Sequence, residues 1–600
     1  MAPAAIVVCA AMLALRKLDD FDTWWHLAAG RWIAANGAVP ATDTLSHTVR
    51  AHPWIDMQWA FDLILYGLHA LGGPALLCAA GAIGFSLTIV LVFRLIRPLL
   101  GDIVSAIFLV PVILAASDRF VLRPELSSFP LLLGVVSVLE YGRSRNGRGS
   151  WLLVPLMLVW VNTHALFVIG AFAIVCALFP FPARPSRKLA LWGGASLAAV
   201  FINPYGLQGA LFPFKLLSRI DGSNPAFQTI AEFRSPFAAD AGGAALAGYK
   251  IVLVAGLVAA VAALAVAVRR NFDWGGFVFF AGLACLSFAA RRNAALFAVG
   301  CAPFIARCAG SVMASVPGSV RDRARKRAPL AVAAIVGFAV IFGGSVATGA
   351  FYRWDRQPRE FGTGVMEGTF PIRAAAFARD ARLPSKLYND VAAGGYLSWD
   401  NPLGDGVFID GRLEVYDTAF FTGYVQAMYD QTQWQADADR FGIQTAIIFH
   451  RWENRRLLIE RLVHGPDWSL VYADEVAAVF VRTRGNEAAL ARAAAINERW
   501  NARTREWLER PAAKWPYPAG RAEGLRAFAR LLATVNDADG ATEAYTKLLE
   551  LGIPSSDEID VRLILARRFA ATGRIEEAKE QSRRILAIDP RNAEAQKLLP

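Results

Sequence analysis

Long apolar runs separated by short polar stretches fill the first 350 residues of the chain. A helix needs about 20 apolar residues to cross a bilayer, and fewer where flanking arginines reach the headgroups. On this criterion we expect about eleven spans, near residues 1–15, 74–96, 103–117, 127–140, 151–162, 164–180, 189–203, 250–268, 275–290, 294–310 and 329–349. The pattern therefore predicts a polytopic α-helical membrane domain over residues 1–350.

The pattern changes after Arg353, where charged residues become frequent. Residues 360–485 mix strand and helix periods, which predicts a soluble α/β domain. Residues 487–600 are Ala-rich and helical, with spacings similar to a tetratricopeptide (TPR) repeat, so we expect a helical repeat region that binds partner proteins or caps the preceding domain. Within 360–485 the expected elements are helices at 372–382, 418–431 and 453–464, strands at 386–388, 407–410 and 445–449, and a hairpin at 468–483.

Composition supports the membrane assignment, because 55% of the residues are hydrophobic and only 19% are charged. The formal net charge of +12 would also suit a nucleic-acid-binding protein. The basic residues, however, gather between apolar runs as the positive-inside rule requires of cytoplasmic loops, so no nucleic-acid partner is expected. With an odd number of spans, the C-terminal half lies on the opposite side of the membrane from these basic clusters. The clusters are Arg94 and Arg97; Arg143, Arg145 and Arg148; Arg184, Arg187 and Lys188; Arg269 and Arg270; and Arg321, Arg323, Arg325, Lys326 and Arg327.

Several polar segments fall on the opposite, non-cytoplasmic side of this topology. Ionisable side chains at membrane depth are costly and usually functional, although any one of them could be a helix end whose side chain reaches the headgroups. Together on one face they indicate an outward-facing site at the bilayer surface. Its candidate residues are Arg123, Glu125, His164, Glu232, Arg291 and Arg292.

The outer loop at residues 18–59 is unusual because acidic residues stand beside tryptophans. Carboxylates can remove a proton or hold a cation, and flat aromatic rings can stack on a sugar or lie at a lipid headgroup. An aromatic belt with solvated acids is the alternative interpretation. The candidate residues of this loop are Asp20, Asp22, Trp24, Trp25 and His26.

A further candidate pair follows the expected strand at 407–410. Asp410 and Arg412 stand where α/β folds often bind ligands, yet structural capping or a salt bridge would explain them equally well. The sequence contains no Walker-type phosphate loop, no zinc-type Cys/His spacing, and no G-x-S-x-G or H-E-x-x-H motif. Nucleotide, zinc and serine-hydrolase chemistry therefore have no sequence signature in this chain.

Residues 20–27, DFDTWWHL, resemble the first outer loop of bacterial glycosyltransferases of the GT-C superfamily. The resemblance covers roughly residues 1 to 485 and implies transfer of a sugar from a polyprenyl-phosphate-linked donor to an envelope glycan, lipid or protein on the non-cytoplasmic side. Further blocks similar to these proteins are Gly30-Arg31-Trp32, Pro40-Ala41-Thr42-Asp43, Arg123-Pro124-Glu125, Asn162-Thr163-His164, Asn203-Pro204-Tyr205-Gly206, Asn389-Asp390 and Gly394-Gly395-Tyr396-Leu397.

The resemblance also implies roles for individual residues. Asp22 is the first choice for the base that deprotonates the acceptor and Asp20 the second, and the pair would hold a divalent cation, Mg²⁺ or Mn²⁺, if one is used. Arginines, among them Arg291 or Arg292, would hold the carrier phosphate. His26 and His164 are candidates for acceptor or phosphate contacts. The chain lacks a second D-x-D or E-x-D pair in a later outer loop, a departure from the family pattern that weakens the case for a metal.

Two alternatives stay open. One is a non-enzymatic membrane scaffold whose TPR-like repeats recruit protein partners for envelope polysaccharide assembly. The other is a carrier-lipid-dependent polymerase or ligase of surface glycans. In the GT-C interpretation the protein is an enzyme of the bacterial inner membrane that contacts membrane lipids and a polyprenyl-phosphate sugar donor, with its C-terminal domains on the periplasmic or outer side.

Overall fold

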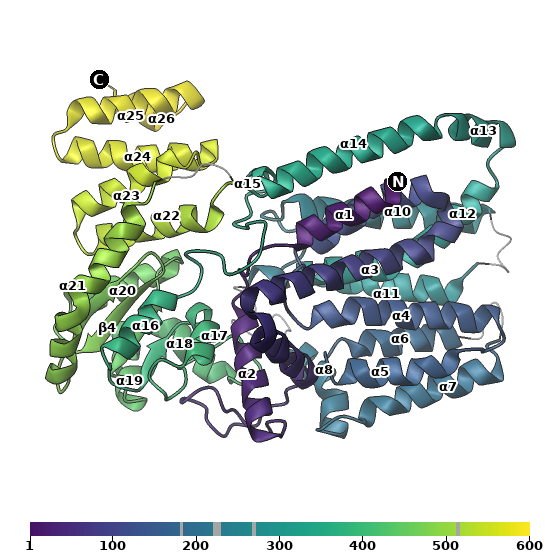
Figure 1. Ribbon diagram of the computed structural model, residues 1–600, viewed down its shortest axis with the longest axis horizontal. Helices are drawn as coiled ribbons and strands as arrows, with labels where there is room; N and C mark the ends of the chain where they lie inside the picture. The colour runs from purple at the N-terminus through teal and green to yellow at the C-terminus, as the bar shows by residue number, and fades with distance from the viewer. Residues whose placement is uncertain (180–183, 220–229, 267–271, 512–515, 600) are drawn as a thin grey trace.

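The computed structural model describes residues 1–179, 184–219, 230–266, 272–511 and 516–599. A bundle of long helices lies beside a smaller α/β domain, and a stack of C-terminal helices rises from that domain (Figure 1). The bundle holds most of the apolar sequence, and α2 (Asp22–Asn36) lies between the bundle and the α/β domain.

A helix lies at each of the eleven expected spans, two of which fall within α3. Within the described residues, α3, α10, α14 and the segment Arg291–Ala314 are long and apolar enough to cross a membrane, whereas the other apolar helices are shorter, so the count of eleven stays a prediction. The bundle helices are α1 (Ala2–Ala14), α3 (Trp59–Ser117), α4 (Glu125–Ser144), α5 (Leu153–Val161), α6 (Phe167–Leu178), α7 (Arg187–Ala198), α8 (Leu207–Arg219), α10 (Ala244–Val266), α11 (Trp274–Ala289), α12 (Ala294–Ala314), α13 (Gly318–Lys326), α14 (Ala328–Ala347) and α15 (Ala350–Trp354).

Helix α3 shows why this bundle suits a membrane. Phe85 and Ile89 are one turn apart and at most 1% exposed, so this face packs into the bundle core. Ile83 and Leu87, on another face of the same helix, are 69% and 49% exposed. A helix that is apolar on its buried and on its outer face is typical of a membrane span. The backbone at Gly101 has φ +75°, a left-handed conformation that only glycine adopts easily, and it ends one helical piece of α3 and starts the next.

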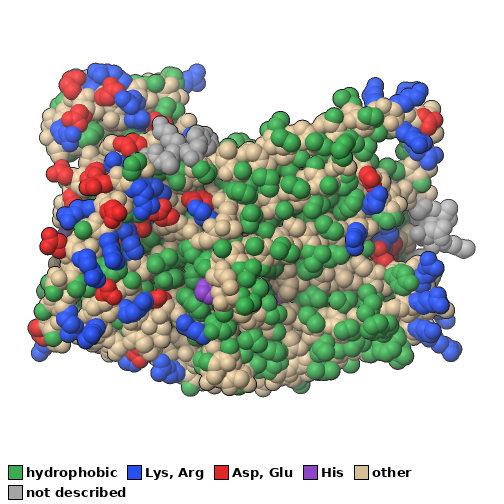
Figure 2. Space-filling view, viewed as in Figure 1, with side chains coloured by type: hydrophobic (Ala, Val, Ile, Leu, Met, Phe, Trp, Pro, Cys, Tyr) green, Lys and Arg blue, Asp and Glu red, His purple; other side chains and the backbone are tan. Residues whose placement is uncertain are grey.

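Arginine and lysine side chains gather at the end of the bundle that lies away from the α/β domain (Figure 2). This end contains the turn after α4 and helix α13, where Arg145, Arg148, Arg321 and Arg325 are exposed. The expected cluster at Arg269 and Arg270 lies outside the described residues. The distribution agrees with the expected segregation of charge, whereas the side of the membrane that this end faces stays a prediction.

The α/β domain has a four-stranded sheet in the order β1-β2-β4-β3, in which β1 and β2 are parallel and the other pairs antiparallel. Leu387 of β1 lies opposite Thr445 of β2, which lies opposite Val481 of β4 on its other side. The elements are α16 (Ile372–Asp380), β1 (Leu387–Asn389), α17 (Val391–Asp400), α18 (Thr418–Ala427), α19 (Gln431–Arg440), β2 (Thr445–Phe449), α20 (Arg456–His464), β3 (Trp468–Ala473) and β4 (Ala477–Arg482).

Three expectations for these regions are wrong. The helix expected at 418–431 ends at Ala427 as α18, and a second helix, α19, begins at Gln431; residues 407–410 do not join the sheet. Val407 instead pairs with the outer loop, where its amide donates to Leu45 O at 3.0 Å and its carbonyl accepts from His47 N at 3.0 Å. The third is the outer stretch 18–59, which is not a loop throughout because it contains α2.

Helix α2 packs closely on both of its neighbours because glycines stand at the contacts. A Cβ at Gly30 of α2 would overlap the carbonyl of Asp62 in α3, and a Cβ at Gly395 of α17 would overlap the carbonyl of Phe21. These close approaches fix the start of α2, and with it Asp20 and Asp22, between the bundle and the α/β domain.

The C-terminal helices are α21 (Glu487–Glu509), α22 (Ala519–Thr534), α23 (Ala538–Glu550), α24 (Ser555–Ala571), α25 (Ile575–Ile588) and α26 (Ala593–Lys597). Trp500 of α21 is 2% exposed and packs edge-on against Phe377 and Tyr472 of the α/β domain. From α22 onward, successive helices pack as pairs, α22 with α23 and α24 with α25. Their assignment as tetratricopeptide repeats stays a prediction.

Candidate active site

Seven charged side chains meet at the end of the bundle that faces the α/β domain, and we call them the charged network. They come from four places in the chain: the start of α2, the turn between α3 and α4, the short helix η3 (Ala231–Phe233) and the short helix η5 (Arg291–Asn293). Six of the seven were expected site residues, and Arg119 is the addition. The members are Asp20, Asp22, Arg119, Arg123, Glu125, Glu232 and Arg292.

Arg123 connects the carboxylates of the first outer stretch to the rest of the network. Its Nη2 lies 2.6 Å from Asp20 Oδ1 and 3.0 Å from Asp22 Oδ2. Its Nε donates to both oxygens of Asp20 at 3.0 Å, and its Nη1 lies 3.7 Å from Glu232 Oε2. A guanidinium that is bound in this forked geometry is held firmly in one position.

The other two arginines differ in how strongly they are engaged. Arg119 is buried, forms an ion pair with Glu125 and donates to Glu232 Oε2 at 2.7 Å. Arg292 lies farther from its partners, at 3.5 Å from Glu125 and 3.6 Å from Glu232, and its side chain is 30% exposed. Its guanidinium stacks over the ring of Phe233 at 4.9 Å. Arg292 is therefore the arginine of the network that a ligand can engage most easily.

Two carboxylates of the network have opposite pKa shifts. Burial raises the pKa of Asp22 to about 6, because Arg123 only partly opposes the rise and Asp20 adds to it. For Glu232 burial acts in the same direction, but Arg292, Arg123 and Arg119 outweigh it and lower the pKa to about 2. Asp22 is thus the carboxylate that can take up a proton near neutral pH, and its side chain is 24% exposed.

The backbone of the α/β domain closes the site on the side of Asp22 away from Arg123. A Cβ at Gly411 would overlap Asp22 Oδ1 and would lie 3.2 Å from Trp25 Nε1. The absence of a side chain at Gly411 therefore lets the segment after residues 407–410 reach the carboxylate.

Both candidate histidines lie beside the network and are held by hydrogen bonds. His26 is one helical turn after Asp22 and is 2% exposed, with Nδ1 2.6 Å from Asp62 Oδ1. Burial lowers the pKa of His26 to about 4, so the imidazole is neutral at pH 7. His164 follows α5, and its Nδ1 lies 2.7 Å from Ser128 Oγ.

The expected substrate-stacking role of Trp24 and Trp25 is wrong, because these rings are 3% and 5% exposed. Trp24 packs edge-on against Phe370 and Tyr396, with ring centroids 5.3 and 5.0 Å apart. Trp25 stacks on the imidazole of His26 at 3.6 Å. The helical geometry of α2 turns both rings into packed interfaces, so no face is left for a sugar.

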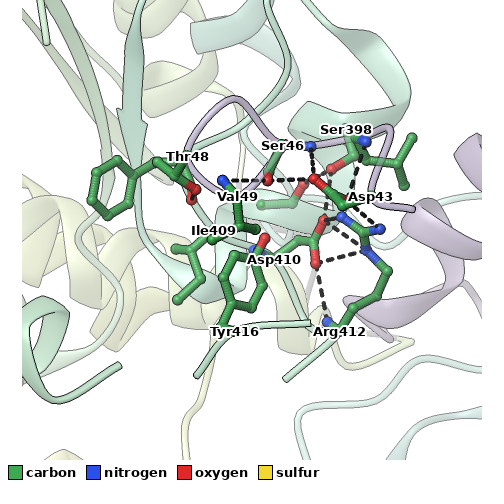
Figure 3. Close-up of polar contacts among 12 residues, drawn as sticks. Asp43, Ser46, Thr48, Val49, Ser398, Ile409, Asp410, Arg412 and Tyr416 are labelled. Carbon is green, nitrogen blue, oxygen red and sulfur yellow. Dashed lines mark hydrogen bonds and ion pairs between the residues drawn. The ribbon is translucent and has the colours of Figure 1, made fainter. Parts of the chain in front are cut away.

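Asp410 and Arg412 also belong to the structural core rather than to a binding site. Arg412 lies between two carboxylates, 2.7 Å from Asp43 Oδ1 and 2.7 Å from Asp410 Oδ2, and all three side chains are fully buried (Figure 3). The guanidinium stacks over Trp54 at 4.5 Å. This buried triad joins the outer stretch to the α/β domain, which confirms the alternative of a salt bridge.

Arg291 lies outside the network, because its Nη2 binds Asp240 Oδ1 at 2.6 Å and its Nε donates to Ser235 O at 3.3 Å. The expected cation site at Asp20 and Asp22 does not fit the structure either. The guanidinium of Arg123 bridges the two carboxylates where the ion would bind. Over the described part of the chain, no three His, Cys, Asp or Glu side chains are placed to hold a metal ion.

Sequence analysis missed Arg119, Asp62 and Gly411. Arg119 stands next to Asp118 in one of the outer polar segments, and this position alone does not distinguish a buried member of a network from a charge at a helix end. Asp62 offers a better signal, since a carboxylate in an otherwise apolar helix is costly and needs a partner. For Gly411 the contact with Asp22 is tertiary, and the sequence carries no sign of it.

No family model matches the sequence, and no curated protein matches it. Among solved structures, the apo oligosaccharyltransferase of Archaeoglobus fulgidus is similar with a TM-score of 0.54 and 12% identity, over 76% of this chain and 71% of that one. The same archaeal enzyme, AglB, in complex with an inhibitory peptide and a dolichol-phosphate gives 0.49 and 12%, over 76% and 70%. ArnT from Cupriavidus metallidurans bound to undecaprenyl phosphate gives 0.43 and 15%, over 80% and 98%.

At these identities the similarity concerns the fold alone, and it rests on the apo archaeal structure, whose TM-score exceeds 0.5. The chain therefore shares the fold of that oligosaccharyltransferase over 76% of its length.

Proposed function

We propose that the protein is a glycosyltransferase that moves a sugar from a polyprenyl-phosphate-linked donor to an envelope glycan, lipid or protein, on the non-cytoplasmic side of a bacterial inner membrane. The observation that carries this proposal is the charged network, in which Asp22, a carboxylate with a near-neutral pKa, pairs with Arg123, while Arg119 and Arg292 belong to the same network through Glu232. The GT-C-like fold supports it, since the similar archaeal protein is an oligosaccharyltransferase.

Asp22 is the base in this proposal. An acceptor hydroxyl is a weak nucleophile, and a carboxylate within hydrogen-bond reach accelerates its attack by taking the proton. The acceptor oxygen forms a bond to the anomeric carbon of the sugar while its proton passes to Asp22. Arg123 and Gly411 hold the carboxylate from two sides, so it stays fixed for the attack.

Arg292 stabilises the leaving group. As the bond between the anomeric carbon and the phosphate oxygen breaks, its electron pair stays on the phosphate, whose negative charge grows. A guanidinium donates two parallel hydrogen bonds to such a group and stabilises the added charge. Arg292 is free to do this because its present ion pairs are long and its side chain is partly exposed.

Asp20, Arg119, Arg123, Glu125 and Glu232 have a supporting role in this proposal. Their ion pairs hold the turn between α3 and α4 against η3 and the start of α2. The apolar outer faces of the bundle helices would accommodate the polyprenyl chain, because lipid tails pack against such surfaces without a desolvation cost.

The test is an Asp22→Asn variant in a strain whose own copy is deleted. Removing a general base typically lowers the rate about 10² to 10⁴-fold, so lipid-linked sugar should accumulate as it does in the deletion strain. The volume hardly changes, and the membrane-inserted amount should equal that of the wild type.

Asp19→Asn is the matched control for this experiment. Asp19 is adjacent in sequence, yet its carboxylate lies 3.6 Å from Arg16 and 4.0 Å from Arg359, outside the network. A catalytic role for Asp22 predicts that Asp19→Asn restores normal lipid-linked sugar levels. Full complementation by membrane-inserted Asp22→Asn would refute the transferase assignment.

A second function, a scaffold for envelope polysaccharide assembly, is favoured by the helix pairs α22–α23 and α24–α25. Stacked helix pairs of this kind often bind peptides or partner proteins. The same experiment separates the two functions, because a scaffold should tolerate the loss of one carboxylate at Asp22.

A further inference from the structure

The charged network contains more acidic than basic groups. Four carboxylates, Asp20, Asp22, Glu125 and Glu232, face three guanidinium groups, so the network has a formal excess of one negative charge when all seven are ionised. An anionic donor can therefore bind only where a guanidinium is not already neutralised.

Two of the three arginines are fully occupied. Arg119 binds Glu125 and Glu232, and its side chain is 8% exposed. Arg123 contacts Asp20 through three hydrogen bonds and lies 3.0 Å from Asp22. Removing either guanidinium from its partners would leave buried carboxylates without a counter-charge, which is strongly unfavourable.

Arg292 remains as the one arginine of the network with weak pairing. Its distances of 3.5 and 3.6 Å to Glu125 and Glu232 exceed those of a charge-assisted hydrogen bond. The ring of Phe233 supports the guanidinium from one face at 4.9 Å, which leaves its edge available for a planar, two-point contact.

Basic residues close in sequence to the network members are committed elsewhere among the described residues. Arg291 and Arg234 both bind Asp240, at 2.6 and 2.9 Å, and Arg16 is out of reach because it is only 6% exposed. Arg359 binds Asp118 at 3.2 Å. The described residues thus supply one available guanidinium, and Asp20 and Asp22 are bridged by Arg123 rather than placed around a cation.

From this charge balance we propose that the site takes a donor whose sugar is joined to the polyprenol through a single phosphate and rejects one joined through a diphosphate. The inference rests on the proposed function. A sugar phosphodiester carries a single negative charge, which one guanidinium can match with two hydrogen bonds. The second phosphate of a diphosphate would bring its charge next to Glu125 and Glu232, where the described residues supply no further unpaired cation to offset the repulsion.

The reaction balances with this donor. The acceptor oxygen bonds to the anomeric carbon and its proton passes to Asp22. The bond from that carbon to the phosphate oxygen breaks, and the electron pair leaves with polyprenyl monophosphate. The product phosphate has gained charge on the oxygen that faces Arg292.

The two carriers can be compared without knowing the sugar. Full-length protein in nanodiscs is titrated with undecaprenyl monophosphate or undecaprenyl diphosphate in the presence of EDTA, and binding is measured by thermal shift and native mass spectrometry. We expect the monophosphate to bind at least about tenfold more tightly, because like charges brought together at a site cost several kcal/mol. Inorganic phosphate serves as the control for binding that needs no lipid.

Three variants test the residues on which this preference depends. Arg292→Gln should weaken monophosphate binding at least about tenfold, whereas Arg291→Gln should not, because its guanidinium is bound to Asp240 outside the network. Glu232→Gln removes one negative charge beside Arg292 and should narrow the gap between the two carriers. Equal effects of Arg291→Gln and Arg292→Gln would overturn the assignment.

The possible failures are distinct. Equal or tighter binding of the diphosphate would overturn this inference and leave the proposed glycosyltransferase intact. Saturable binding of inorganic phosphate alone, with no gain from the lipid, would show an anion site rather than a carrier site. Failure of both carriers to bind the wild-type protein would refute the inference and the proposed donor class together.

Discussion

Asp22 and Glu232 belong to the same charged network but have very different affinities for a proton. Both are removed from water, and the difference comes from the number of guanidinium groups that surround them. Glu232 faces Arg119, Arg123 and Arg292, whereas Asp22 has Arg123 and the repelling carboxylate of Asp20. The network therefore keeps one carboxylate permanently ionised and leaves the other able to exchange a proton near neutral pH.

This difference predicts the pH dependence of sugar transfer. Asp22 must be deprotonated to act as a base, and burial raises its pKa to about 6. Activity should therefore rise with pH through a midpoint near 6 and level off above 7. The measurement is the transfer rate from pH 4.5 to 8.5.

Arg123 opposes the rise in the pKa of Asp22, so an Arg123→Gln variant should have its activity midpoint at higher pH. The Asp19→Asn variant should keep the wild-type midpoint. A rate that is already near its plateau at pH 4.5, as expected of an aspartate with the ordinary pKa of 3.8, would show that the group that limits activity is not a desolvated Asp22.

Gly411 allows a second test at the residue scale. A Cβ at this position would overlap Asp22 Oδ1, so Gly411→Ala should displace the carboxylate while leaving the domain folded. Small displacements of a reacting group can lower rates about 10²-fold, and we expect a loss of that order in the transfer assay. Gly423→Ala is the matched control, because a Cβ there has its nearest neighbour, Gln433 Nε2, at an ordinary 3.5 Å. Equal activity of the two variants would contradict the positioning role of Gly411.

The site residues that sequence analysis found share one physical property. Glu125, Glu232 and Arg292 are charges near the ends of apolar segments, where ionisation is costly and marks function. For Trp24 and Arg412 the sequence could not decide between a binding site and the structural core, because a buried ring or a buried ion pair looks the same in sequence as an exposed one. Their burial depends on partners such as Tyr396 and Asp43 that are distant in the chain.

At the scale of elements, apolar runs located the bundle helices other than α8, α13 and α15, and the pattern located most elements of the α/β domain. It failed for α2, where residues on nearly all sides are buried and no amphipathic stripe is present. It also failed at residues 407–410, whose apolar run suggests a strand but whose backbone pairs with the outer stretch instead of the sheet. Both failures occur where the membrane domain and the α/β domain meet.

The packing of helix α21 on the α/β domain predicts where the chain can be shortened. Its Trp500 is packed against Phe377 and Tyr472, and burial of such a ring contributes roughly 4 to 6 kcal/mol of hydrophobic stabilisation. A chain that ends at residue 486 should therefore lose the cooperative unfolding of the α/β domain, as measured by thermal denaturation and limited proteolysis.

A chain that ends at residue 552 is the control, because it keeps α21 through α23 and removes only the later helices. We expect it to insert in the membrane, to resist proteolysis and to keep its transfer activity. Loss of activity in this shorter chain, with normal folding, would show that α24 to α26 belong to the catalytic unit.

At the scale of the whole molecule, the two ends of the bundle differ in charge and in what they contact. The exposed arginines and lysines of α13 and of the turn after α4 lie at one end (Figure 2), and the α/β domain lies at the other (Figure 1), beside α2, whose first residue is Asp22 of the charged network. Helix α14 joins them over 20 residues, a length of about 30 Å that matches the hydrocarbon core of a bilayer. The proposed side of the reaction depends on this polarity.

Reporter fusions test the polarity directly. Fusions after residues 145, 186 and 325 should report the cytoplasm, because positive charge next to a span is retained on that side. Fusions after residues 50 and 400 should report the opposite compartment, since residue 50 lies in the outer stretch after α2 and residue 400 ends α17 of the α/β domain. The three fusions expected in the cytoplasm lie in different turns of the bundle. If all three report the same side, the result cannot be caused by one fusion that disturbs membrane insertion. If residues 325 and 400 report the same side, α14 does not span the membrane, and the lipid-linked donor cannot reach Asp22 from the non-cytoplasmic side.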